Sequence, residues 1–571
     1  MVRGCARLWG LVLHSRVPRP SLRTGGVLSR QGTFRLSKSH IKPGAPPFSA
    51  FFAERVGAAT TDATPGFSGT FNRRSNGHSR QAGVLSRRST QLLASPAGNA
   101  RNPLTLGFRS MNRNRKHRTV SAVLTLILAI APAASAEWKE KVLYSFQGGT
   151  NDGSVPAGGV VFDKQGNLYG ATTGGGPSTC APFGSECGTV FQLSPPAQKG
   201  GSWTETLIYQ FQGKGSNDGS VPNGGLIIDA AGNLYGVTAY GGTGYCLLLG
   251  SNAGCGTVYK ISPPQQQGGA WTETILYSFA TAKEGYLAIG NLVFDSAGNL
   301  YGATWFGGDK GTTCDSLYGG QCGVVFELSP PKQHGGKWTE KVLHSFAGGT
   351  DGANPNGGLV LDRKGAVYGT APIGGNQLCN FGNGNVGCGI VFRLLAPATN
   401  GTRWTEQMVH RFADKDGAGP NGGLIFDAKG RLYGTTGGGG GGTNQGVVFR
   451  FVPARTGRSW VEDLLHVFSG EGNAPCCPSA GLALDPSGGF YGVSLGGQYF
   501  RGTTFLMKQP TTPSGAWRFA LVDTFRGAPD AAYPEARVIF SSAGNLYGTT
   551  QGGGSGEACD GGCGTVFELK P

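Results

Sequence analysis

Seven tryptophans divide most of this 571-residue chain into units that share one sequence pattern. The units begin at Trp138, Trp203, Trp271, Trp338, Trp404, Trp460 and Trp517, at spacings of 65, 68, 67, 66, 56 and 57 residues. A unit that recurs in this way is one supersecondary structure, which cannot bury its apolar face alone and has to stack on its neighbours. The repeat therefore limits the chain to architectures in which similar units pack side by side.

The second unit shows the pattern most fully. It consists of WTETLIYQF from Trp203, NDGSVPNGGLIID to Asp229, GNLYGVT from Gly232, a glycine-rich loop, and CGTVYKISPP to Pro264. Each piece is a short β-type run bounded by Gly, Pro, Asn or Asp, so each unit predicts four strands and no helix. In the first piece, strict alternation places Ile208 on the face opposite Tyr209.

These units predict an all-β fold, a seven-bladed β-propeller of four-stranded blades. A linear β-solenoid is the structural alternative, but its coils are usually shorter and it needs caps at both ends. The Trp138 strand is a fourth strand, whereas the chain ends at Pro571 just after a third strand. We therefore expect the N-terminal strand to join the C-terminal blade and close the ring, which leaves no exposed sheet edge at a seam.

The recurring GG-L-x-x-D-x-x-G-N-L-Y-G-x-T-x-x-G-G, followed by G-T-V-F-x-L-x-P, resembles the GloVer-type tandem repeat of bacterial exported proteins. It is more distantly similar to the strand grammar of NHL-type propellers. The resemblance covers residues 137–571. It implies a repeat fold and export, and it brings no biochemical activity with it. Members of that family often end in a surface-anchoring tail, and since this chain stops at its last strand we expect a soluble exported form.

The N-terminal part is basic and the repeat region is not. Residues 1–136 hold 21 Lys and Arg against two acids, which leaves 28 bases and 31 acids in the repeats. A basic footprint for nucleic acid is therefore absent from the repeat region. Residues 111–136 combine a basic start, an apolar centre too short to span a membrane and an Ala134-Ser135-Ala136 cleavage pattern, which predicts a signal peptide.

Because a signal peptide belongs at a true N-terminus, we interpret residues 1–110 as an over-extended, disordered leader. An organellar transit peptide is the alternative reading of this Arg- and Ser-rich segment. We expect residues 137–571 to form the propeller, with no membrane span in the mature chain, in a secreted or periplasmic and monomeric protein.

Twelve of the 13 cysteines follow the leader, and ten of them form pairs in the loops between second and third strands. The pairs are Cys180 with Cys187, Cys246 with Cys255, Cys314 with Cys322, Cys379 with Cys388, and Cys559 with Cys563. Local disulfides fit this spacing and an exported protein better than zinc sites, since no histidines accompany the pairs. The adjacent Cys476 and Cys477 lie in a different loop, and either a vicinal disulfide or pairing elsewhere is open to them.

Several repeated polar residues have structural readings. An aspartate ends the first strand in six blades, at Asp163, Asp229, Asp295, Asp362, Asp427 and Asp485, with Ser541 in the seventh. We predict that it caps the turn to the second strand. The tyrosine of each L-Y-G element is expected in the core between blades, with its hydroxyl satisfied at the edge. His344, His410 and His466 replace a tyrosine on the fourth strand, which predicts packing with a hydrogen bond.

We predict no cofactor and no catalytic residues. The loops before the first strands contain fragments of a calcium loop, which makes Asp152, Asp218, Asp351 and Asp416 weak calcium candidates. None of these loops has the full ligand set, and ordinary polar turns are the favoured interpretation.

In alternating up-and-down strands, the loops from fourth to first strand and from second to third strand emerge on one face. We predict that this face acts as a binding surface for a glycan or protein ligand of the cell envelope or exterior. Trp305, Tyr240 and Phe381 are the candidate contacts. One alternative is a lactonase-like or lyase-like enzyme with a site in the central channel, identifiable by acids or histidines unique to one blade. The other is a purely structural surface repeat.

Overall fold

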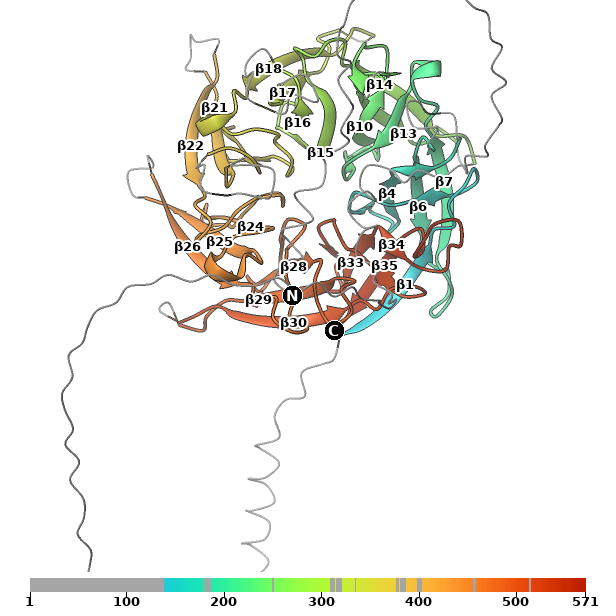
Figure 1. Cartoon of the computed structure of the whole chain (residues 1–571). Helices are drawn as coiled ribbons and strands as arrows, with labels where there is room; N and C mark the ends of the chain where they lie inside the picture. Colours follow the sequence, from blue (N-terminus) through green and yellow to red (C-terminus); the bar gives the residue numbers. More distant parts are fainter. Residues whose placement is uncertain are drawn as a thin grey trace, which may run out of the picture. The chain divides into compact units, whose positions relative to one another are not determined.

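A computed structural model describes residues 138–177, 180, 186–248, 251–266, 268–308, 314, 321–333, 335–375, 379, 387–397, 403–454, 459–512 and 515–571. The predicted leader at 1–110 and the predicted signal peptide at 111–136 lie outside the described residues. The described part is a ring of seven blades, as the repeat predicts (Figure 1).

Each blade is an antiparallel sheet of four strands, numbered here from the ring centre outward. The first blade contains β3 (Val161–Phe162), β4 (Leu168–Thr172), β6 (Thr189–Ser194) and β7 (Thr204–Gln210). The second contains β9 (Ile227–Ile228), β10 (Leu234–Gly241), β13 (Thr257–Ser262) and β14 (Thr272–Ser278). The third contains β15 (Tyr286–Phe294), β16 (Leu300–Phe306), β17 (Val324–Ser329) and β18 (Thr339–Ser345).

The next three blades repeat this order. The fourth contains β19 (Val360–Leu361), β20 (Val367–Ala371), β21 (Ile390–Leu395) and β22 (Thr405–Arg411). The fifth contains β23 (Ile425–Phe426), β24 (Leu432–Thr436), β25 (Val447–Pro453) and β26 (Trp460–Val467). The sixth contains β27 (Ala483–Leu484), β28 (Phe490–Ser494), β29 (Thr503–Lys508) and β30 (Arg518–Thr524).

The seventh blade is assembled from both ends of the repeat region, as predicted. It contains β32 (Ile539–Phe540), β33 (Leu546–Thr550), β35 (Thr565–Lys570) and, as its outermost strand, β1 (Lys139–Ser145). In the register, Lys139 lies opposite Lys570 and Ser145 lies opposite Thr565. Figure 1 shows β1, coloured cyan, beside the red β35. Hydrogen bonds between β1 and β35 therefore fasten the ring.

The loops contain further short strands and 3-10 turns. β2 (Gly153–Ser154) pairs with β5 (Gly174–Gly175), β8 (Gly219–Pro222) with β10, β11 (Leu247–Leu248) with β12 (Ser251–Asn252), and β31 (Ala531–Ala532) with β34 (Gly552–Gly553). The described 3-10 turns are η2 (Lys214–Ser216), η4 (Gly349–Asp351) and η5 (Gly441–Thr443). Within the described residues, no helix is long and apolar enough to cross a membrane.

The core lies between the blades. Seven clusters of buried apolar side chains each combine residues of two adjacent blades, including the boundary between the seventh and the first. The repeated tryptophans contribute to them: the Trp203 ring packs edge-on against Tyr547 of the preceding blade, and Trp271 packs in the same way against Tyr169. The L-Y-G tyrosines are therefore part of the core between blades.

The prediction of strict alternation on the fourth strands is wrong, because a β-bulge interrupts each of them. In the first blade Tyr209 pairs with Val190 and Leu207 with Phe191, so Ile208 is the extra residue. Ile208 is buried, whereas strict alternation placed it with the exposed threonines. The same register shift occurs in all seven blades. Bulges of this kind redirect the side chains next to them.

Candidate functional site

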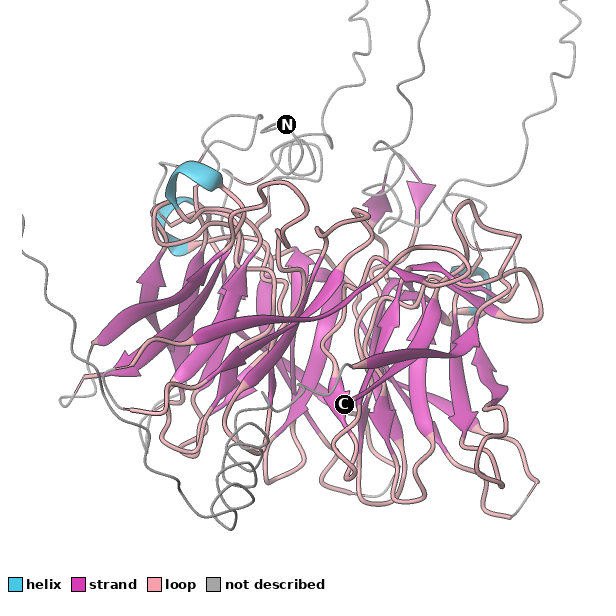
Figure 2. Ribbon diagram, turned by 90° about the horizontal axis from the view of Figure 1, so that it is seen from below, coloured by secondary structure: helices cyan, strands magenta, loops and turns pink. Residues whose placement is uncertain are grey.

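The loops from fourth to first strand and from second to third strand share one face, which we call the loop face (Figure 2). The backbone N–H of Gly176, in a second-to-third loop, donates to the carbonyl of Gly149, in the preceding fourth-to-first loop, over 2.9 Å. Gly375 donates to Gly349 in the same way, over 2.7 Å. Because the first, second and third strands of a blade are consecutive and antiparallel, the tight turns between first and second strands lie on the other face. The loop face therefore carries the long, variable segments.

Disulfides close five of the second-to-third loops. The five predicted cysteine pairs are all bonded, with Cα–Cα distances of 5.0 to 5.3 Å. The sulfur atoms of Cys476 and Cys477 are 2.8 Å apart, too far for a bond between them. Disulfides of this number are typical of proteins in oxidising compartments.

A backbone contact that the sequence did not reveal joins neighbouring blades on the loop face at six of the seven boundaries. Val221 has a left-handed φ of 56° and donates its N–H to the carbonyl of Cys187 in the preceding blade over 2.8 Å. Equivalent bonds run from Val155 to Cys563, Asn354 to Cys322, Gly419 to Cys388, Cys477 to Gln445 and Tyr533 to Arg501. Since each donor has a positive φ and precedes a proline, the six bonds form one repeated latch.

The latch explains one glycine of the repeat. A Cβ added to Gly188, which precedes the third strand of the first blade, would lie 2.5 Å from Pro222 Cδ in the next blade. Gly564 stands in the same relation to Pro156 across the closure of the ring, also at 2.5 Å. Only glycine permits this approach, because both positions also have a φ above 80°.

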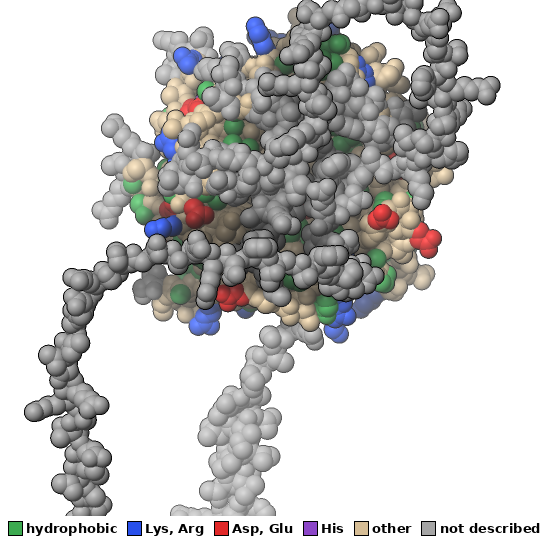
Figure 3. Space-filling view, viewed as in Figure 1, with side chains coloured by type: hydrophobic (Ala, Val, Ile, Leu, Met, Phe, Trp, Pro, Cys, Tyr) green, Lys and Arg blue, Asp and Glu red, His purple; other side chains and the backbone are tan. Residues whose placement is uncertain are grey.

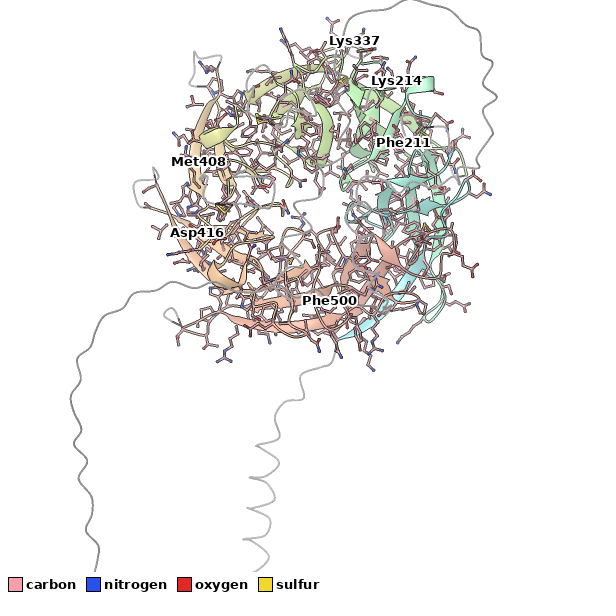
Figure 4. All side chains as sticks on the ribbon, in the orientation of Figure 1. Phe211, Lys214, Lys337, Met408, Asp416 and Phe500 are labelled. Carbon is pink, nitrogen blue, oxygen red and sulfur yellow. A yellow bond between two sulfur atoms is a disulfide. The ribbon has the colours of Figure 1, made fainter. Side chains whose placement is uncertain are left out.

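Two apolar patches project from second-to-third loops on the loop face. The first patch is Tyr245, 68% exposed, and Leu247, 55% exposed, next to the Cys246–Cys255 disulfide of the second blade. The second patch is Tyr499, 42% exposed, and Phe500, 61% exposed, in the sixth blade (Figure 4). Phe500 has a φ of 55°, which a bulky side chain rarely adopts. Exposed aromatic side chains on restrained loops are suited to contact with a ligand.

The predicted contact residues have different surroundings. Trp305 is partly buried and stacks on Phe306 with ring centroids 6.1 Å apart. Tyr240 is 3% exposed and belongs to the core cluster between the second and third blades. Phe381 lies outside the described residues. Trp305 is therefore partly accessible to a ligand, whereas Tyr240 is buried in the core between two blades.

The weak calcium candidates act as acceptors for nearby donors. Asp152 accepts hydrogen bonds from the Tyr144 hydroxyl and from the backbone N–H groups of Gln147 and Gly153. Asp218 repeats this arrangement with Tyr209. Burial raises the pKa of both aspartates, and these hydrogen bonds oppose the rise. Asp351 and Asp416 instead lie beside histidines.

The turn aspartates cap their turns. Asp229 Oδ1 accepts from the backbone N–H groups of Ala231 and Asn233, and its Oδ2 accepts from the Tyr235 hydroxyl over 3.0 Å. Burial alone would raise the pKa of Asp229, but these hydrogen bonds lower it below its usual value. In the seventh blade, where Ser541 replaces the aspartate, the Tyr547 hydroxyl donates to Glu568 instead. This aspartate ring is therefore structural.

The segments before the innermost strands are mostly glycine. A Cβ on Gly158 would lie 2.3 Å from the Gly224 carbonyl oxygen, and one on Gly224 would lie 2.2 Å from that of Gly290. In the seventh blade, Ala536 and Arg537 take the place of the two glycines, and Glu535 comes directly before them. Burial raises the pKa of Glu535 to about 7, opposed by a hydrogen bond from Gln551 over 2.6 Å. Comparing aligned units could have revealed this pair.

Both signs of charge are interspersed around the rim visible in Figure 3. This distribution agrees with the near-neutral balance of the repeat region. The fold and its loop face thus define a tandem-repeat propeller with restrained surface loops.

The chain belongs to the Gloeobacter/Verrucomicrobia repeat family, whose family model matches residues 129–376 and 246–505. The resemblance seen in the repeat sequence is therefore confirmed. No curated protein matches the chain.

Solved structures of similar fold include a gluconolactonase from Xanthomonas campestris, at 16% identity and a TM-score of 0.30, covering 60% of this chain and 82% of that one. A luciferin-regenerating enzyme matches at 14% identity and a TM-score of 0.34, covering 63% and 93%. PorZ, a surface component of the type-IX secretion system of Porphyromonas gingivalis, matches at 16% identity and a TM-score of 0.33, covering 68% and 48%. Likeness at this level concerns the fold and carries no argument about function.

Proposed function

We propose that the protein is an exported binding module that holds a glycan or protein ligand of the cell envelope or exterior on its loop face. The observation that carries this proposal is the pair of apolar patches, Tyr245 with Leu247 and Tyr499 with Phe500. A large aromatic side chain held in place before binding loses little conformational entropy when it contacts a ligand. Aromatic residues are also the side chains that most often dominate binding energy.

The loops that carry these patches are restrained in two ways. The Cys246–Cys255 disulfide closes the loop of the first patch. In the loop of the second patch, the Arg501 guanidinium lies 5.2 Å from the Tyr533 ring centroid, and the Arg501 carbonyl accepts the latch hydrogen bond from Tyr533. The left-handed backbone at Phe500 is the kind of local strain that concentrates at binding sites. Restraint and exposure together favour recognition.

The test is capture of ligands by the full chain on a glycan array and from solubilised envelope fractions. We expect Tyr245→Ser or Phe500→Ser to weaken the captured interaction about tenfold, which corresponds to about 1.4 kcal/mol. Trp305→Ala tests the predicted contact in the third blade.

Leu521→Ser is the matched control, because Leu521 is 51% exposed but lies on the outer strand β30. Binding that survives changes in both patches, or that falls equally in the control, contradicts the proposal.

Glu535 and Arg537 favour a second candidate function, a ligand or substrate site in the central channel. They place a carboxyl group and a positively charged guanidinium at positions where the other blades have neither. A carboxyl group with a pKa of about 7 is suited to general acid or base chemistry near neutral pH. Hydrolysis of a lactone or ester panel by the full chain, lost in Glu535→Gln, would support this function. Equal rates in the two proteins would rule it out.

A further inference from the structure

The boundary between adjacent blades has a repeated polar group on its outer side. In six of the seven boundaries, the residue six positions after the tryptophan lies next to an acid of the following loop, and a glutamate two positions after the next tryptophan completes the group. In three boundaries the first residue is tyrosine. Its hydroxyl donates to the acid in the pairs Tyr144–Asp152, Tyr209–Asp218 and Tyr277–Glu284, over 2.9 to 3.0 Å.

Three successive boundaries have histidine in place of tyrosine, and two of them also have both acids of the group. The first group is His344 of β18, Asp351 of η4 and Glu406 of β22. The second is His410 of β22, Asp416 of the following loop and Glu462 of β26. In each group the three ligand-type atoms all lie within 4.8 Å of one another. Figure 4 shows Asp416 between the blades of β22 and β26.

The distances match the geometry of a zinc site. His410 Nε2 is 3.1 Å from Asp416 Oδ2 and 3.5 Å from Glu462 Oε2, and His344 Nε2 is 3.4 Å from Asp351 Oδ2. Zinc bonds to nitrogen and oxygen of about 2.0 to 2.2 Å in a tetrahedron place neighbouring ligand atoms roughly 3.3 Å apart. The observed separations are therefore close to the edges of such a tetrahedron.

The surroundings favour a cation. Two carboxylates meet one imidazole in each group. Backbone N–H groups hold the aspartates in place, from Ala347 to Asp351 and from Ala413 to Asp416, each over 2.7 Å. Imidazole with carboxylates selects zinc-like transition metals, whereas calcium takes oxygen ligands.

We propose that the protein binds a zinc-class divalent cation at each of these two boundaries, through His344, Asp351 and Glu406 and through His410, Asp416 and Glu462. The three side chains leave a fourth coordination position for water or a ligand. Because His410 and Glu406 both come from β22, the two cations would fasten the fourth blade to both of its neighbours.

The chain supplies its own matched substitution, since tyrosine fills the histidine position in three other boundaries. Metal-free protein titrated with Zn²⁺ in a calorimeter, with bound metal counted by atomic emission, should take up two equivalents per chain. His344→Tyr or His410→Tyr should each remove one equivalent, and the double variant should remove both. The metal-free double variant should keep the melting temperature of the metal-free parent.

His466→Tyr is the control. His466 stacks on Phe519, with ring centroids 4.2 Å apart, where other boundaries have the glutamate, so this variant should retain both equivalents. Asp351→Asn with Asp416→Asn is a second double variant, which keeps an oxygen acceptor for the backbone N–H groups and should also bind no zinc. No zinc uptake by the parent, unchanged uptake by either double variant, or uptake of Ca²⁺ in place of Zn²⁺ would overturn the proposal.

Discussion

Half-buried glutamates at the blade boundaries have raised pKa values. Burial and the charge of Asp152 raise the pKa of Glu205 to about 7, and burial and Asp218 do the same for Glu273. At the closure, burial and the neighbouring Asp530 and Asp523 raise the pKa of Glu140 to about 10. Each of these glutamates has a buried Oε1 without a hydrogen-bond partner among the described residues. The folded state therefore favours their protonated forms.

This arrangement predicts an unusual pH dependence. Because the folded pKa of Glu205 and Glu273 exceeds the unfolded value of about 4.3, their contribution to stability is complete below that value and is lost as the pH rises to about 7. Glu205→Gln with Glu273→Gln should raise the free energy of unfolding at pH 8 by about 1 kcal/mol per site, after allowance for solvent screening, and change little at pH 5.

Melting temperatures in the presence of a chelator measure this effect. Glu557→Gln, which changes an exposed glutamate, is the control and should melt like the parent at both pH values. A double variant that is no more stable than the parent at pH 8 would contradict the raised pKa values of Glu205 and Glu273.

At the scale of elements, the strands could be predicted from the sequence more fully than the contacts between them. Alternation within WTETLIYQF predicts the fourth strand, but the bulge at Ile208 comes from pairing with β6, and a single strand does not show it. The latch at Val221 was also missed, because valine has no local preference for a positive φ. Its signal was the proline at 222, which recurs in six of the seven units.

The disulfides of the second-to-third loops were predictable because five pairs recur at one place in the repeat. Closing a loop of this length is expected to stabilise the folded state by about 2 to 3 kcal/mol. Cys379→Ser with Cys388→Ser should therefore lower the melting temperature under oxidising conditions. Reduction should lower the melting temperature of the parent towards that of the variant. A variant with the same melting temperature as the oxidised parent would show that the disulfide adds no stability.

At the scale of the whole molecule, the seven tryptophans that open the repeat units predict the number of blades, and the strand at each end of the repeat predicts the closure. The candidate site was less predictable. The loop face follows from strand direction, yet the exposed Tyr245 and Phe500 and the buried Tyr240 are distinguished only by packing between blades. Glu535 and Arg537 belong to no recognisable motif, and only their difference from the other units marks them in the sequence.

Closure of the ring by β1 is the claim on which the loop face and every blade boundary depend, and hydrogen exchange of the intact chain tests it most directly. We expect the backbone amides of 139–145 to exchange as slowly as those of the other outer strands, such as β7 and β14, because they pair with β35. Fast exchange over 139–145 would contradict closure of the ring, because β35 stays paired with β33 whether or not β1 joins it.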